Sequence, residues 1–127
     1  GDESKIGDDA QQKLGRETFR NELETALAQG LNVLVDNTNF NQRTRNPVLD
    51  RVKRAGYTDV QLLVLDVPLD ECLRRNSKRK RVVAESLIRM MHGSLHGDGW
   101  PQAAEGKVVT IAPTDDRQIY SVQFPEA

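Results

Sequence analysis

Two short apolar runs, each ending in an aspartate, constrain the fold of this chain more than any other feature. The first is Asn-Val-Leu-Val-Asp at residues 32–36, and the second is Val-Gln-Leu-Leu-Val-Leu-Asp at residues 60–66. Short runs rich in β-branched side chains are typical of buried strands rather than helices. Helical signals occupy the segment between them, and a helix between two buried strands favours parallel pairing. The sequence therefore predicts an α/β fold.

Helical patterns surround these two runs. Apolar residues recur at helical spacing over residues 16–29, and Gly30 is a natural helix stop. Asn46 as cap and Pro47 at the first helical position predict a helix that reaches residue 55; whether a turn of helix precedes Pro47 stays open. The remaining expected elements are helices at about 69–77 and 84–95, followed by strands at 107–111 and 119–124.

This order of elements predicts a three-layer domain with a mostly parallel sheet. A chain of 127 residues fits one domain, residues 1–127, in which 97–127 supply the C-terminal strands. Right-handed crossovers place the ends of the first two strands at one edge of the sheet, where such folds bind ligands. Asp36 and Asp66 are therefore expected near the site.

Composition narrows the function classes only slightly. The net charge of −1 does not indicate a nucleic-acid binder, so local clusters must carry that argument. Cys72 is the only cysteine, which excludes an internal disulfide or a cysteine-based zinc site and fits a cytoplasmic protein. There is no run of about 18 apolar residues, so no membrane partner is expected.

Polar residues directly follow the first predicted strand, in the order Asp-Asn-Thr-Asn. The carboxylate of Asp36 could orient magnesium-bound water, and Thr38 and Asn39 offer donors and acceptors to phosphate or base edges. The alternative is a strand-to-helix turn capped by its own Asx side chains, and composition alone favours that turn.

A dense basic stretch follows the second predicted strand. Residues 74–81, Arg-Arg-Asn-Ser-Lys-Arg-Lys-Arg, contain six basic residues in eight. The planar guanidinium of arginine binds two phosphate oxygens at once, and lysine adds a point charge. A solvated helix end is the alternative, but six cations exceed what a helix dipole requires. We therefore expect this stretch to bind anions.

Three further features are less specific. Arg43 and Arg45 lie just past the first predicted strand and could face a nucleic-acid backbone. His92 and His96 are four residues apart on a predicted helix, but no acidic residue completes a metal motif, so no metal site is predicted. Trp100 could stack on a base, although such a residue more often anchors a loop.

The Asp-Asn-Thr-Asn turn, the basic stretch and the strands before them carry a resemblance to a known family. They resemble the polynucleotide 5′-hydroxyl kinases, a group of P-loop kinases, and most closely those of the phage type. The resemblance covers about residues 16–95 and is closest at Arg75–Arg79, which is similar to the lid of that family. The stretches that carry it are residues 33–39, 65–68, 75–79 and 87–91.

The resemblance implies a three-layer P-loop-kinase-like fold and ATP-dependent, magnesium-dependent phosphoryl transfer. In that family the lid arginines close over the nucleotide phosphates and stabilise charge during transfer. Arg75 and Arg79 would thus be catalytic, and Lys78 would join them in binding ATP.

The resemblance also implies a substrate site for the 5′ ends of DNA or RNA. Asp36, Thr38, Asn39 and Arg43 would lie beside the phosphate acceptor. The sequence does not distinguish DNA, RNA and a nucleotide as acceptor, because related kinases share this scaffold.

One departure from the family is large. No G-x-x-x-x-G-K-[ST] phosphate-binding loop occurs in the sequence, and Asp8 and Asp9 lack the arginine three residues on that the family's catalytic helix carries. We therefore expect a fold incomplete at its N-terminus, with an exposed sheet edge, and a chain that is inactive alone. The sequence leaves open whether the P-loop is lost, cut off, or supplied by a partner chain or another domain. The alternatives are a non-catalytic phosphate-binding module and a structural subunit whose open edge pairs with a partner.

Overall fold

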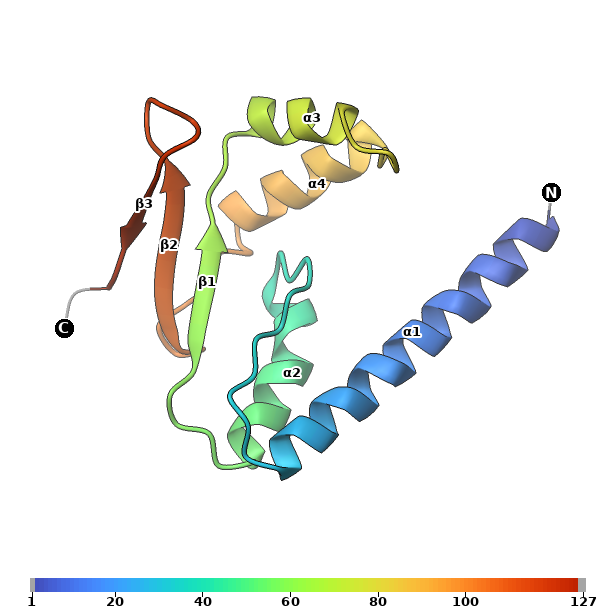
Figure 1. The fold of residues 1–127 in the computed structure, drawn as a ribbon, viewed down its shortest axis with the longest axis vertical. Coiled ribbons are helices and arrows are strands. Elements are labelled where there is room, and N and C mark those ends of the chain that lie inside the picture. The colour runs from blue at the N-terminus through green and yellow to red at the C-terminus, as the bar shows by residue number, and fades with distance from the viewer. Residues whose placement is uncertain (1, 126–127) are drawn as a thin grey trace.

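The structure is a computed structural model that describes the backbone of residues 2–125 and the side chains of residues 10–125. It is a mixed α/β fold (Figure 1). The predicted helices at 69–77 and 84–95 and the two C-terminal strands are confirmed to within one or two residues. The elements are α1 (Asp2–Ala28), α2 (Gln42–Arg54), β1 (Gln61–Leu65), α3 (Leu69–Ser77), α4 (Glu85–His96), β2 (Lys107–Pro113) and β3 (Tyr120–Gln123).

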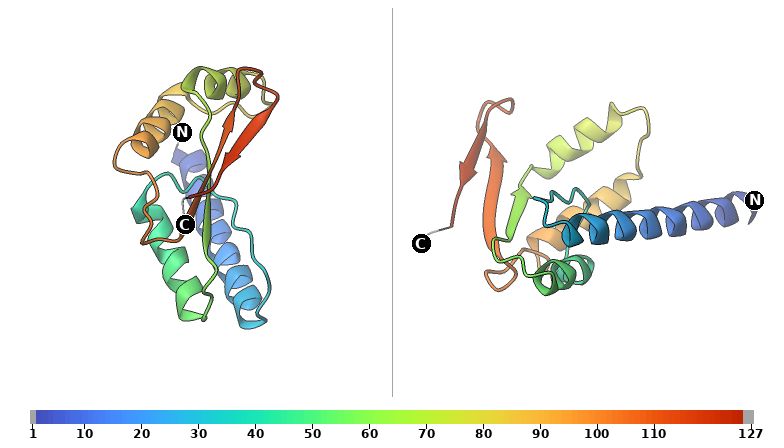
Figure 2. Two further views of the ribbon diagram at one scale, coloured as in Figure 1. Left: turned by 90° about the vertical axis from the view of Figure 1, so that its left-hand side faces the viewer. Right: turned by 60° about the horizontal axis from the view of Figure 1, so that its bottom comes forward.

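The sheet has three strands in the order β1-β2-β3. β1 runs parallel to β2, with Gln61 opposite Lys107 and Leu65 opposite Ile111, whereas β3 is antiparallel to β2. All four helices lie toward the β1 edge and none lies beyond β3 (Figures 1 and 2). A mostly parallel sheet with helical layers on both faces is therefore not confirmed.

The first predicted strand, residues 32–36, is not part of this sheet. The segment is extended but forms no ladder, and Leu34 is 80 % exposed. A strand needs a hydrogen-bonded neighbour for its backbone amides and carbonyls. Within the described residues β1 pairs only with β2, and the hydroxyl of Tyr57 donates to the carbonyl of Leu31 at 2.6 Å. The prediction of a buried strand here was wrong.

The second predicted strand does form, but it is buried on one face only. Leu62 and Val64 point into the core, while Leu63 and Leu65 are exposed. This alternation follows from the two-residue period of a strand. Among the residues described, β1 is also an end strand of the sheet, with β2 as its one strand neighbour.

The two N-terminal helices differ from their predicted limits. α1 is longer than the 16–29 pattern, and its N-terminal part projects away from the body (Figure 1). Among residues 10–28, the buried side chains are those of Leu23 and Leu27 in the last turns. Gly30 stops it with φ of 68°, the left-handed region that glycine adopts readily. α2 begins after Asn41, whose side chain accepts from the Thr44 amide at 2.9 Å, so the predicted cap at Asn46 was wrong.

The apolar core is small, and polar side chains are buried beside it. Since buried polar groups must be hydrogen-bonded to be tolerated, each of these has a partner described below. No helix in the described part of the chain is both long and apolar enough to cross a bilayer. The buried apolar residues are Leu23, Leu27, Leu62, Val64 and Val109, and the buried polar ones are Arg45, Glu71, Asn76 and Glu105.

Candidate functional site

The turn after the first predicted strand forms one wall of an open groove of about 790 Å³. Asp36 and Thr38 face α1 across it, and both are exposed. Asp36 is the one carboxylate that lines this groove among the described residues. Magnesium in phosphoryl-transfer sites commonly uses one or two carboxylates together with substrate phosphates, so Asp36 fits part of such a site. The other lining residues are Gln12, Gly15, Arg16, Phe19 and Asn37.

A buried ion pair between Arg45 and Glu105 holds this turn in place. Asn39 has a φ of 35°, and its carbonyl accepts from Nη1 of Arg45 at 2.9 Å. The same guanidinium binds the Glu105 carboxylate through Nε at 2.7 Å and Nη2 at 3.3 Å, with both side chains less than one-tenth exposed. Burial raises the pKa of Glu105, but the hydrogen bonds from Arg45 and the Gln102 amide outweigh it and lower the pKa overall.

The prediction that Arg45 could face a nucleic-acid backbone was therefore wrong. Arg43 is exposed, and its contact with a substrate stays a prediction. Residues two apart on a helix point in widely different directions, so one of them can be buried while the other faces solvent. No local pattern identifies the buried one, because its partner Glu105 lies 60 residues away.

The loop after α4 packs closely on the same turn. A Cβ on Gly99 would lie 2.2 Å from the carbonyl oxygen of Phe40 and 2.5 Å from that of Ser94. Only glycine permits this approach of two backbones. The turn at residues 36–40 is therefore held on one side by Arg45 and on another by this loop.

The basic stretch 74–81 divides into two parts, and the first part is engaged within the protein. Arg74 and Arg75 bind the buried carboxylate of Glu71, with Nε–O distances of 2.9 and 3.0 Å, and Arg117 adds a third guanidinium at 3.3 Å. The hydrogen bond from Arg74, with those from Arg75 and Arg117, lowers the pKa of Glu71 to about 2. Glu71 is thus ionised throughout the physiological pH range.

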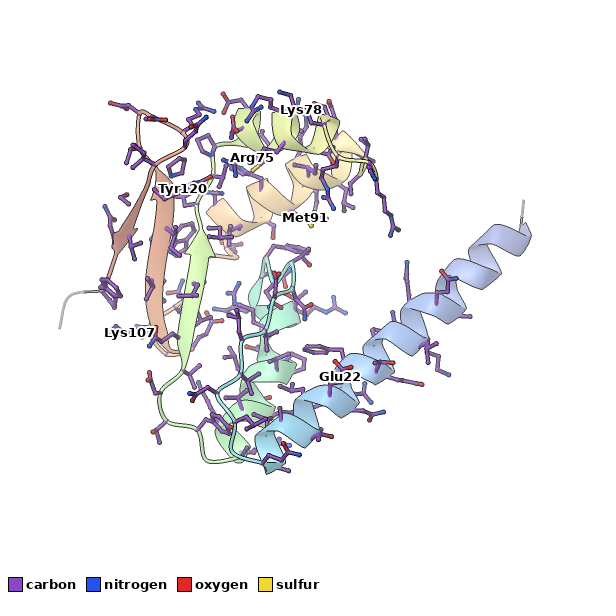
Figure 3. The ribbon with its side chains drawn as sticks, viewed as in Figure 1. Glu22, Arg75, Lys78, Met91, Lys107 and Tyr120 are labelled. Carbon is purple, nitrogen blue, oxygen red and sulfur yellow. The ribbon has the colours of Figure 1, made fainter. Side chains whose placement is uncertain are left out.

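Arg75 has a further partner on β3. Its Nη2 donates to the hydroxyl of Tyr120, and its guanidinium lies 5.8 Å from the centre of that ring; the two side chains adjoin in Figure 3. Together with the Arg117–Asp70 pair at 3.2 Å, this contact ties the β2–β3 hairpin to α3. In this arrangement Arg75 is bound to protein groups, and its role on nucleotide phosphates stays a prediction.

The second part of the basic stretch is exposed to solvent. Lys78, Arg79, Lys80 and Arg81 follow the end of α3, and all four are exposed. Across residues 10–125 none of their side chains pairs with a carboxylate. Four unpaired cations on one short loop form a strongly positive surface that favours anions such as phosphate. We call residues 78–81 the cation loop.

An asparagine that the sequence interpretation did not single out closes the cation loop. Asn76 is 3 % exposed, its Nδ2 donates to the carbonyl of Val83 at 2.8 Å, and its Oδ1 accepts from the Val83 amide at 3.0 Å. The one signal in the sequence was an asparagine in the last turn of a helix, where that residue type often caps or turns the chain.

A second titratable cluster lies where β1 ends. His96 Nε2 lies 2.6 Å from Oδ1 of Asp66, and Nδ1 lies 2.9 Å from the carbonyl of His92. Its ring stacks on that of His92, with 4.1 Å between the ring centres, and lies beside the ring of Trp100, with 5.5 Å between the ring centres. Asp66 thus meets α4 and not the turn of Asp36. The contact of Trp100 with His96 fits a loop anchor better than a base-stacking platform.

We expect this cluster to make stability depend on pH. Both ring nitrogens of His96 face acceptors, so the protonated ring satisfies both, and the hydrogen bond to Asp66, then that to His92, raises the pKa of His96. Because the pKa of His96 is higher in the folded state, protonation of the ring stabilises the fold. This stabilisation is complete below the unfolded-state pKa of about 6.5 and is lost as pH rises through the folded-state pKa. The urea midpoint of the wild type should exceed that of His96→Gln by more at about pH 6 than at about pH 8.5.

Asp66→Asn serves as the control for this prediction. It removes the anion that favours the protonated ring. The urea midpoints of Asp66→Asn and of the double variant Asp66→Asn/His96→Gln should therefore differ by an amount that depends much less on pH. An equal gap between wild type and His96→Gln at both pH values would contradict the prediction.

Five of the seven predicted site residues therefore form two groups. Asp36, Thr38 and Asn39 form the turn beside the groove, and Lys78 and Arg79 lie on the cation loop. Both groups lie beyond the β1 edge of the sheet (Figure 1), but no described contact joins them.

The sequence profile of a family described as an AAA domain matches residues 2–95. The chain belongs to this family, whose members are P-loop NTPase-like kinases. Membership indicates a nucleotide-binding, kinase-like function, and such P-loop domains generally bind nucleotide and Mg²⁺. No curated protein and no solved structure matches the chain significantly.

Proposed function

We propose that this domain serves in ATP- and magnesium-dependent transfer of a phosphoryl group to the 5′-hydroxyl of DNA, RNA or a nucleotide. The observation that carries the proposal is the cation loop, whose four exposed cations pair with no carboxylate among residues 10–125, in a member of a P-loop kinase-like family. Phosphoryl transfer depends mainly on positioning and on stabilising charge, which exposed cations can provide. The choice of a 5′-hydroxyl acceptor rests on the resemblance of residues 33–39 and 75–79.

Each group of residues has a separate part in this proposal. On the cation loop, Lys78 and Arg79 hold phosphate oxygens of ATP and neutralise charge that develops on them. Across the groove, Asp36 accepts a hydrogen bond from the acceptor end or from metal-bound water, and Thr38 donates to the flanking phosphate. Arg75 joins the phosphates if its contact with Tyr120 opens.

For this reaction, a phosphate-binding loop must come from outside these 127 residues. No G-x-x-x-x-G-K-[ST] occurs among the 127 residues, and one groove carboxylate cannot replace the backbone nest, lysine and hydroxyl of that motif. Another chain or another domain would supply it, in the cytoplasm, where ATP is abundant.

The test measures transfer of labelled phosphate from ATP to an oligonucleotide in a protein that carries the P-loop. A 5′-hydroxyl end should be labelled and a 5′-phosphate end should not. Neutralising all four cations of the cation loop should abolish labelling while the far-ultraviolet circular dichroism stays unchanged. Binding of ATP and oligonucleotide without any transfer would favour the alternative, a phosphate-binding module, and absence of both would refute the proposal.

Replacing Asp36 by alanine should raise the KM for the oligonucleotide acceptor about tenfold, because one hydrogen bond to a charged group is lost. The KM for ATP should change much less. Asp50→Ala, which removes an exposed carboxylate from α2, is the matched control and should leave both values unchanged. Wild-type KM and kcat in Asp36→Ala would mean that Asp36 only shapes the turn.

A further inference from the structure

The cation loop is held at both ends by polar contacts with the last turn of α3. At its start, the amides of Lys78 and Arg79 donate to the carbonyls of Arg75 and Asn76, each at 3.2 Å. At its end, the side chain of Asn76 makes both of its hydrogen bonds with the backbone of Val83. The chain from residue 77 to residue 82 is therefore a closed ring with Asn76 at its base.

This closure opposes two physical tendencies of the loop. Adjacent cations repel one another, and an exposed loop of long side chains gains entropy when it extends. Apolar packing provides little resistance, since residues 78–82 are all exposed. The described contacts that hold the far end of the ring to α3 are the two bonds of Asn76, which are largely shielded from water.

We propose that Asn76 is a positioning residue that closes residues 77–82 into a ring and so presents the four cations of the cation loop together to one polyphosphate or nucleic-acid strand. The inference rests on the proposed function for the ligand, but the closure itself does not. Asn76 touches no phosphate in this role. It acts through Lys78–Arg81, whose charges it leaves unchanged.

The first measurement is limited digestion of the folded protein with trypsin, which cuts after lysine and arginine. In Asn76→Ala, cleavage after residues 78–81 should be about tenfold faster than in the wild type, because the loss of two hydrogen bonds populates the open loop. Cleavage after Arg54, at the end of α2, is the internal reference and should not change. Asn46→Ala, which alters an exposed asparagine on α2, is the matched control.

The second measurement is the salt dependence of binding to a short single-stranded oligonucleotide with a 5′-hydroxyl end. Each phosphate contact contributes about −0.7 to the slope of log affinity against log salt, so four cations acting together give up to about −3. The slope should be shallower in Asn76→Ala although its net charge equals that of the wild type. A residue that only stabilised the fold would not alter the slope in the folded protein.

Asn76→Ser provides a second variant in case Asn76→Ala does not fold, since a serine hydroxyl can bond to its own helix but cannot span to Val83. Faster loop cleavage with a shallower slope supports the proposal. Unchanged cleavage and slope in a folded variant would overturn it. If the wild type binds neither ATP nor the oligonucleotide, the proposed function fails, while the cleavage comparison still decides whether Asn76 closes the ring.

Discussion

Replacing Glu105 by alanine is expected to lower the free energy of unfolding by about 3–5 kcal/mol, because it leaves the buried guanidinium of Arg45 without its partner. The pair is bidentate and less than one-tenth exposed, and Arg45 also binds the Asn39 carbonyl. For a domain stabilised by about 5–15 kcal/mol, this is a large fraction of the total. Urea denaturation at neutral pH, where Glu105 is ionised because its pKa is lowered, measures the effect.

Two comparisons make this result specific. Glu85→Ala breaks an exposed pair with Arg89 at 4.0 Å and should cost no more than about 0.5 kcal/mol. A double variant in which Arg45 and Glu105 become methionine and leucine should recover most of the loss, since apolar replacements leave no uncompensated charge. A cost below about 1 kcal/mol for Glu105→Ala would show that Arg45 reaches water when its partner is removed.

Replacing Arg79 by alanine is expected to reduce kcat for phosphoryl transfer about 10³-fold in a protein that carries the P-loop. An arginine that stabilises charge on the transferred group contributes on the order of 10³–10⁵ in rate. Arg79 is exposed and unpaired among the described residues, so its removal should leave the fold unchanged. Single-turnover labelling of a 5′-hydroxyl oligonucleotide measures the chemical step separately from product release.

Arg81→Ala is the matched control, because it removes the same charge from the same cation loop. It should slow transfer less than about tenfold, as expected for the loss of one general electrostatic contact. Equal losses in both variants would mean that the loop acts by its total charge rather than through Arg79. Transfer at the wild-type rate in Arg79→Ala would show that the lid assignment is wrong.

The divided basic stretch explains why two arginines of similar predicted role differ in the structure. Arg75 lies on α3, where Glu71 is one helical turn away and Tyr120 is brought close by the β2–β3 hairpin. Arg79 lies beyond the helix end and forms no ion pair with the carboxylates of residues 10–125. Glu71 thus binds both helical arginines, whereas the side chains of the cation loop form no ion pair among the described residues.

Local elements were largely predictable from the sequence. The limits of α3 and α4, the stop at Gly30 and the two C-terminal strands depend on spacing and turn residues that act over a few positions. The cation loop was equally predictable, since its charge density is a property of consecutive residues. The family resemblance to P-loop kinases rested on the same short stretches, and the match of residues 2–95 supports it at that coarser level.

The errors occurred where a partner distant in sequence decides the outcome. Residues 32–36 have the composition of a buried strand, but a strand requires a hydrogen-bonded neighbour, which this segment does not have in the part of the chain described. Arg45 and Arg43 looked alike because nothing local distinguishes the one that Glu105 buries.

The sequence by itself determined most of the helices and strands, where the positive charge concentrates and which family of folds is involved, because these follow largely from near neighbours along the chain. Only the tertiary structure decided which charges are free. It buries Arg45 on Glu105, binds Arg75 to Glu71 and Tyr120, and closes the cation loop through Asn76. Burial and pairing depend on residues brought together by folding, and a charge binds a ligand strongly only when the protein has not already paired it.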